Sequence, residues 1–193
     1  MRRAERRQAL VAAATRAFAR GGFAATSLDD IAAEAEVARD TIYRNFDSKT
    51  DLYRAALDAA LQAVQDRFTQ VGAGRFGPEG IEALFAVAHE NPDGFRLLFR
   101  HAAREPEFRG LVDERQAAIT AAAEVGLRRL IPDLARRQWA ARLMPVLVVD
   151  AIISWLDAGS PDPEHAVETV LGIQRSMIRS LRGGLPRSSP HDS

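Results

Sequence analysis

Side chains that can donate hydrogen bonds concentrate in a short stretch of the chain. Two guanidinium groups, two hydroxyls and one amide occur within seven residues, at Arg39, Thr41, Tyr43, Arg44 and Asn45. Hydroxyl and amide donors suit phosphate oxygens, and arginine can bind a guanine edge through two hydrogen bonds. These residue types fit contacts with DNA, although any small helical domain can place polar residues at the same spacing on its surface.

Two histidine–glutamate pairs could suggest a metal site. His101 and Glu105 lie four residues apart, and His89 and Glu90 are adjacent in an earlier predicted helix. A third ligand is not evident and no HExxH sequence occurs, so we interpret these residues as surface polar groups. We expect neither a metal nor a cofactor.

Residues 72–77 match the pattern GxGxxG of dinucleotide-binding sites. No predicted strand precedes them, and Pro78 follows where a backbone N–H would be needed to bind a phosphate. We therefore interpret this stretch as a linker between domains. The sequence also lacks a GxSxG or phosphate-loop pattern, and we expect the protein not to be an enzyme.

The composition is that of a globular protein with an uneven distribution of charge. Of its 193 residues, 26 are basic, 26 are acidic and none is cysteine, which excludes disulfides and thiolate chemistry. Zero net charge argues against nucleic-acid binding over the whole surface. Residues 1–20 nevertheless carry six arginines against one acid, whereas residues 27–40 carry five acids against one arginine. Any contact with nucleic acid must be local.

Abundant alanine and apolar residues three and four apart predict an all-helical chain. The first helix ends at Gly21-Gly22, a pair that can take positive φ. Ser27 and Asp30 begin a second helix as a capping box. A third short helix runs to about residue 46 with Ile42 inward and Tyr43 outward, and a long fourth helix follows.

Further helices are predicted at about 78–90, 92–103, 106–131, 133–158 and 163–182. Residues 143–156 are apolar, but they are too few to span a bilayer and include a proline and an acid, so we interpret them as part of a buried helix. No export signal is visible, which predicts a cytoplasmic protein without a membrane partner.

Residues 10–53 carry a specific pattern of small, apolar and polar positions. It reads Leu-x3-Ala-x2-Ala-Phe-x2-Gly-Gly-Phe-x2-Thr-Ser-x3-Ile-Ala, followed by Ala-x-Val-x3-Thr-Ile-Tyr-x2-Phe-x-Ser-Lys-x2-Leu. The pattern resembles the DNA-binding domain of tetracycline-repressor (TetR) family transcriptional regulators. The resemblance implies a three-helix DNA-binding domain at 4–64, with its helix-turn-helix at about 27–46. A long helix would join it to an all-helical ligand-binding and dimerisation domain at 65–183, and we expect a disordered tail at 184–193.

The resemblance also implies roles for single residues. The first hydroxyl of the second helix, at Thr26 or Ser27, would lie against phosphates, as would Thr41, Tyr43, Asn45 and Lys49. Arg39 and Arg44 would reach base edges. Lys49 is the chain's single lysine and lies near a helix N-terminus, which itself attracts anions. We expect Lys49→Ala to weaken binding to all DNA sequences and to leave folding intact.

Three positions depart from the family pattern. Glu36 stands in the turn where members usually have glycine, and we expect the turn to relax or to carry modest strain. Asp40 replaces a small residue, so it accepts a hydrogen bond from cytosine, pairs with Arg39 or Arg44, or faces away. Asn45 stands where histidine or tyrosine is commoner. The N-terminal arginines form either an arm that reaches DNA or a disordered tail.

Aromatic residues of the second half recur at helical spacing, which by itself fits an ordinary core. The resemblance implies a ligand cavity among the middle helices, and such cavities are mostly apolar with few polar groups. We expect an apolar or amphipathic small molecule to contact Phe85, His89, Phe95, Phe99 and Trp155.

The last two predicted helices are apolar on more than one side and so need cover on both. The resemblance implies that they form a four-helix bundle with the same helices of a second copy. The expected interface residues are Trp139, Leu143, Leu147, Ala151, Val170, Gln174, Met177 and Ile178. The resemblance therefore implies a homodimeric repressor that binds a near-palindromic operator and is released by a ligand. The alternatives are a constitutive DNA-binding protein and a small helical enzyme.

Overall fold

The structure is a computed structural model that describes residues 3–71 and 77–182. Over these residues it is helical and contains no strand, as the sequence predicts. The chain divides into two compact units. The described residues of the first unit are 3–71 and 83–114, and those of the second are 77–82 and 115–182. The predicted tail at 184–193 and most of the predicted linker lie outside the described residues.

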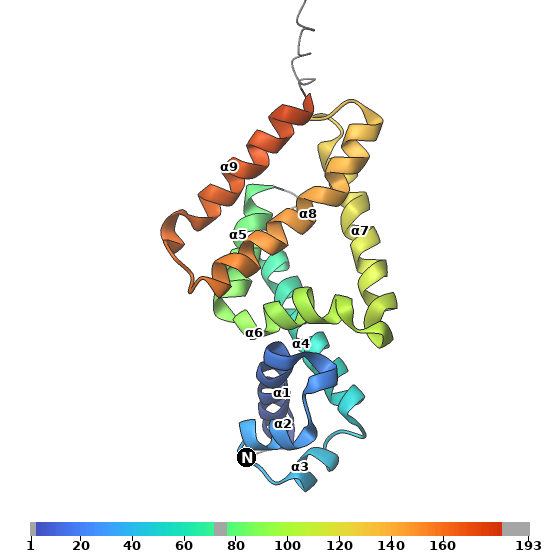
Figure 1. Ribbon diagram of the computed structural model, residues 1–193, viewed down its shortest axis with the longest axis vertical. Coiled ribbons are helices and arrows are strands. Elements are labelled where there is room, and N and C mark those ends of the chain that lie inside the picture. Colours follow the sequence, from blue (N-terminus) through green and yellow to red (C-terminus); the bar gives the residue numbers. More distant parts are fainter. Residues whose placement is uncertain (1–2, 72–76, 183–193) are drawn as a thin grey trace, which may run out of the picture. The chain divides into compact units, whose positions relative to one another are not determined.

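The first unit begins with three helices, α1 (Arg3–Ala25), α2 (Leu28–Glu34) and α3 (Arg39–Tyr43), which lie together in Figure 1. Gly22 interrupts α1 with a φ of 73°, a left-handed conformation that glycine adopts without a steric penalty. Ser27 caps α2: its hydroxyl accepts a hydrogen bond from the Asp30 N–H at 3.1 Å, and the Asp30 carboxylate accepts from the Ser27 N–H at 2.8 Å. The predicted capping box is confirmed.

The long helix α4 (Lys49–Val71) follows, and then α5 (Pro78–Glu90) and the short α6 (Pro92–Arg96). The sequence predicts one regular helix over 92–103, but α6 continues as a π-helical turn, η1 (Leu97–His101), and a 3₁₀ turn, η2 (Ala102–Arg104). In the π-helical turn the Ala102 N–H bonds to the Leu97 carbonyl. Because a π-helix brings residues five apart onto one face, Leu97 and Ala102 are both buried in the same core.

Aromatic side chains close the core of the first unit. The Tyr53 ring from α4 lies 4.8 Å from the ring of Phe18 in α1, and 4.6 Å from that of Phe108 in the 3₁₀ turn η3 (Pro106–Phe108). Phe23 lies 5.0 Å from Tyr53. The compact unit that holds the helix-turn-helix therefore takes part of its core from residues far along the chain. The functional boundary at residues 64 and 65 stays a prediction.

The second unit is built mainly from α7 (Arg109–Leu127), which begins in the first unit, α8 (Leu134–Asp157) and α9 (Pro163–Arg182). Its core gathers Leu127, Ile131 and Met144, with Met177 and Leu181 of α9 packed against them. The ribbon in Figure 1 shows α8 in orange beside α9 in red. By length and composition α8 could cross a membrane, a property that core helices of soluble proteins share, and part of α8 is buried in this unit.

Candidate nucleic-acid interface

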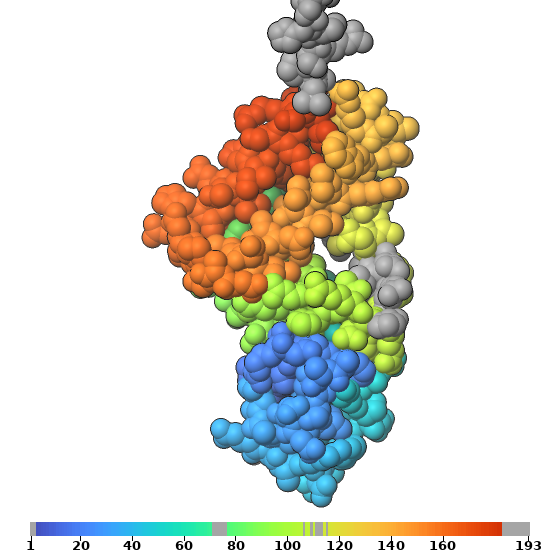
Figure 2. Space-filling view, in the orientation of Figure 1, coloured from blue at the N-terminus to red at the C-terminus, as the bar shows by residue number. Residues whose placement is uncertain are grey.

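Helix α3 presents a polar face because its apolar side chains are used in the core. Ile42 is 1% exposed, and Phe46, which follows the helix, is also buried. Tyr43 is 50% exposed, and Arg39 and Arg44 are exposed too. Figure 2 shows the light-blue surface that includes α2 and α3 open to solvent on the face drawn. The inward position predicted for Ile42 and the outward position predicted for Tyr43 are confirmed.

Arg39 is held by contacts with both helices of the helix-turn-helix. Its Nη1 donates to the two carboxylate oxygens of Asp29 in α2 at 3.1 and 2.9 Å. Its Nη2 donates to the Tyr43 hydroxyl at 3.1 Å, and the guanidinium lies 5.6 Å from the centre of the Tyr43 ring. The hydrogen bond with Tyr43 and then the charge of Asp29 raise the pKa of Arg39 above its ordinary value. The guanidinium is thus charged and oriented.

The other polar groups of α3 contact each other. The Arg44 Nη2 donates to the Thr41 hydroxyl at 3.2 Å, and the Asn45 amide donates to the Thr41 carbonyl at 2.7 Å. Asp40 forms no ion pair with Arg39 or Arg44 in the described part of the chain, so that proposed pairing is wrong. The reason is that Arg39 turns back to Asp29, while Arg44 turns to Thr41.

The turn between α2 and α3 does not relax to accommodate Glu36. Its φ is 53°, in the left-handed region where a side chain is strained. The backbone therefore keeps the conformation that glycine would favour, and Glu36 carries the strain.

Lys49 is engaged within the protein. Its ammonium donates to the carbonyls of Phe23 at 2.9 Å and Thr26 at 3.0 Å, and it lies 4.4 Å from the centre of the Phe23 ring. One of its three N–H groups remains for another acceptor. No sequence pattern indicated these contacts, because the partners lie 23 and 26 residues earlier.

The two candidate hydroxyls before α2 differ. Thr26 is 5% exposed, and its hydroxyl donates to the Gly22 carbonyl at 2.7 Å. Ser27 is exposed and forms the capping box. Of the two, only Ser27 is exposed, and in the free protein its hydroxyl donates to the Asp30 carboxylate at 2.7 Å.

The N-terminal arginines within the described range belong to a helix. Arg3, Arg6 and Arg7 lie in the first turns of α1, so these residues do not form a disordered tail. Contact between them and DNA stays a prediction. The Arg7 guanidinium lies 4.4 Å from the centre of the Phe46 ring. This contact places one cation beside the end of α3.

Two other arginines of α1 share one acid as their partner. Arg16 Nε and Arg20 Nη2 both bond to the carboxylate of Glu34, the first at 2.6 Å. The hydrogen bond from Arg16, followed by that from Arg20, lowers the pKa of Glu34. The positive charge of residues 1–20 and the negative charge of residues 27–40 therefore cancel in part.

His101 and Glu105 are bonded to the backbone of α1. His101 Nε2 lies 2.9 Å from the Ala19 carbonyl, and because a carbonyl only accepts, this nitrogen carries the proton. The Glu105 carboxylate accepts from the Phe23 N–H at 3.0 Å. These contacts replace the earlier interpretation of both residues as surface polar groups. Burial lowers the pKa of His101.

The residues predicted to bind a ligand lie in both units, four in the first and Trp155 in the second. Phe85 and Phe95 are buried, and the Phe95 and Phe99 rings lie 4.6 Å apart, whereas His89 is exposed. The Trp155 ring N–H donates to the Pro161 carbonyl at 2.7 Å.

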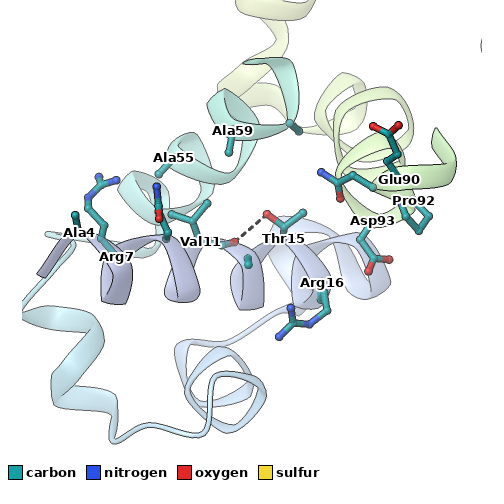
Figure 3. A pocket seen from close by; sticks show the side chains of 14 residues that line it. Ala4, Arg7, Val11, Thr15, Arg16, Ala55, Ala59, Glu90, Pro92 and Asp93 are labelled. Carbon is teal, nitrogen blue, oxygen red and sulfur yellow. Dashed lines mark hydrogen bonds between the residues drawn. The ribbon is translucent and has the colours of Figure 1, made fainter. Parts of the chain in front are cut away.

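A pocket of about 890 Å³ lies elsewhere in the first unit, and none of these five residues lines it. It is bounded by α1, α4 and the α5–α6 turn (Figure 3). Figure 3 shows Arg7 at one end, and Glu90 and Asp93 at the other.

The predicted dimer residues are exposed to different degrees. Trp139 is 58% and Leu147 42% exposed. Val170 is buried within the protomer, and Met177 and Ile178 pack against the core of the same chain. Val146 and Ile173 add exposed apolar area outside the predicted set.

Sequence comparison links the chain to known regulators. Residues 10–56 match the model of bacterial regulatory proteins of the tetR family. The chain is 30% identical over 183 residues to the HTH-type transcriptional activator FasR of Mycolicibacterium smegmatis, covering 86% of this chain and 80% of the relative. It is 37% identical over 67 residues to the DNA-binding transcriptional repressor TetR of Mycobacteroides abscessus, covering 35% of each chain.

Comparison of structures gives the same fold. A TetR-like transcriptional regulator from Rhodococcus sp. RHA1 matches with a TM-score of 0.79 at 19% identity, covering 93% of this chain and 99% of the other. An all-helical chain with an exposed α3 in a helix-turn-helix defines a DNA-binding transcriptional regulator. The chain belongs to the TetR family.

Proposed function

We propose that the protein binds a near-palindromic operator as a homodimer, with α3 of each copy in the major groove. The observation that carries this proposal is the exposed polar face of α3 beside the buried Ile42 and Phe46. Two recognition helices spaced by about 34–36 Å would enter successive major grooves.

The chemistry of each side chain decides whether we propose it for a base edge or for a phosphate of the DNA. Arg39 and Arg44 suit base edges, while Thr41, Tyr43, Asn45 and Ser27 suit phosphates. Lys49 has one N–H left for a phosphate, beside the N-terminus of α4. Thr26 acts indirectly, since its buried hydroxyl bonds to Gly22 and holds the start of α2.

The dimer would form through α8 and α9. Trp139 and Leu147 are exposed and apolar in the single chain, and a second copy would remove them from water. Leu143, Ala151 and Gln174 are partly exposed and would complete the interface. Val170, Met177 and Ile178 would support it mainly from within each protomer.

A small apolar or amphipathic molecule would release the DNA by stabilising a protein conformation that fits the operator poorly. Phe85, His89, Phe95 and Phe99, all in the first unit, are the residues we propose for it. The relative FasR is named an activator and the relative TetR a repressor. We propose repression here, in a cytoplasmic protein without catalytic activity.

The test begins with a random duplex library, from which the protein selects DNA. Enrichment of an inverted repeat, bound by two copies as measured by light scattering, is the expected result. Absence of any enriched sequence would contradict specific DNA binding. Trp139→Glu should give a folded monomer, whereas Gln138→Glu, at an exposed neighbouring position on α8, should remain dimeric. A reporter placed behind the selected sequence then separates repression from activation.

A further inference from the structure

The contacts of Arg39 restrict a side chain that would otherwise be mobile. The guanidinium is joined to Asp29 of α2 by two hydrogen bonds and to Tyr43 of α3 by one. The Arg39 and Asp29 side chains both remain substantially exposed. The network therefore fixes the direction of the guanidinium without burying it.

Part of the guanidinium is left free. It has five N–H groups, of which the contacts with Asp29 and Tyr43 use at most three. The Nε–H has no partner in the described residues, and Nη2 has one N–H besides the one that it donates to Tyr43. Nε and Nη2 form the edge of the planar group that Asp29 does not contact. Such an edge can bind the O6 and N7 acceptors of guanine together.

The charge of Asp29 alters which part of DNA suits Arg39. A phosphate carries a full negative charge, so it attracts a free cation and repels a carboxylate. The Asp29–Arg39 pair has no net charge, and its attraction to phosphate is therefore weak. A base edge offers dipolar acceptors, and hydrogen bonds to these do not need a net charge.

Arg44, which caps the C-terminal end of α3, provides the contrast. Its contact in the described chain is the neutral Thr41 hydroxyl, and no acid pairs with it there. Arg44 therefore keeps its full charge and remains attracted to phosphates as well as to bases.

We propose that Asp29 is a positioning residue that determines specificity, because it holds Arg39 for a base edge and keeps it from the phosphates. This inference rests on the proposed entry of α3 into the major groove. It assigns to Asp29 a role that does not require contact between Asp29 and DNA.

The experiment uses duplexes that the wild-type protein selects from a random library, together with each single-base-pair change and an unrelated duplex of equal length. The variants are Arg39→Ala, Asp29→Ala, Asp29→Glu and the double change of both residues to Ala. Asp40→Ala is the matched control, since it removes one carboxylate from α3 that pairs with neither arginine. Thermal unfolding verifies that each variant is folded.

Arg39→Ala should lower the preference at one base pair of each half-site by about 5- to 150-fold, the range for one bidentate contact. Asp29→Ala should lower the preference at that same base pair and raise affinity for the unrelated duplex. In the double change, the preference at that base pair should be the same as in Arg39→Ala alone. Asp29→Glu should restore the preference in part. Asp40→Ala should raise affinity for all duplexes and keep the preference at the base pair that Arg39 contacts.

Full base preference in Asp29→Ala would overturn the role of Asp29. So would a change in Asp29→Ala that equals the change in Asp40→Ala at every base pair. If the wild-type protein selects no sequence, the failure lies in the proposed DNA binding itself, and that outcome is separate from the behaviour of Asp29.

Discussion

The ammonium of Lys49 donates a hydrogen bond to the Phe23 carbonyl at 2.9 Å and lies 4.4 Å from the centre of the Phe23 ring. A second hydrogen bond, to Thr26, joins the start of α4 to the connection between α1 and α2. The single lysine of the chain thus has an internal role in addition to the phosphate contact proposed for it.

Lys49→Met should lower the free energy of unfolding by about 2 kcal/mol, because hydrogen bonds from a charged donor and a cation–π contact are lost. Chemical denaturation measures this change. Arg44→Met also removes a cation, but one whose contact is a single hydroxyl, so we expect a change within about 0.5 kcal/mol. Equal stabilities of the two variants would contradict the internal role. This prediction revises the expectation that loss of the lysine leaves folding intact.

Glu36→Gly should raise the free energy of unfolding by about 1 kcal/mol, since Gly adopts a φ of 53° without strain. The midpoint of urea denaturation reports the gain. Glu36→Ala is the control because it removes the carboxylate and keeps the strained Cβ. An equal gain in both variants would assign the effect to charge and not to the backbone.

Tyr53→Phe should leave stability unchanged or raise it by up to about 1 kcal/mol. The Tyr53 hydroxyl is buried and has no hydrogen-bond partner in the described residues, so its removal relieves an unfavourable burial. Burial raises the pKa of Tyr53 and keeps the group neutral. Calorimetry measures the effect, and a loss above about 1 kcal/mol would show that the hydroxyl is bonded.

Stability should decline as the pH falls below 6.5, and His101 should be one cause. Burial lowers the pKa of His101 in the folded protein below the ordinary value of 6.5. The unfolded chain then takes up a proton first, so the contribution of His101 is complete above pH 6.5 and is lost as the pH falls through the folded pKa. Urea titrations at several pH values between 7.5 and 5 measure the slope.

His101→Gln is the matched variant for this pH dependence, because its amide can still donate to the Ala19 carbonyl. Its stability should vary less over the same range. His165 has a pKa raised by its hydrogen bond to Asp162, an effect of opposite sign that is present in both proteins and cancels in the comparison. Identical slopes would exclude His101 as a cause.

Much of the helical framework could be predicted from the sequence because the relevant interactions are local. The capping box of Ser27 and Asp30 spans three residues, the left-handed Gly22 follows from the properties of glycine, and the burial of Ile42 beside an exposed Tyr43 follows from helical periodicity. The family pattern is local in the same sense, since it lies within residues 10–53. Sequence alone therefore determined the helix-turn-helix and its polar face.

Only the tertiary structure decided which polar groups bond to one another. Arg39 meets Asp29 ten residues away, Arg16 meets Glu34 eighteen away, and His101 reaches Ala19 across 82 residues. Likewise, the π-helical turn that begins at Leu97 brings two side chains five residues apart into one core. Such pairings depend on how helices pack, and periodicity along one helix carries no information about the charge that a neighbouring helix places beside it.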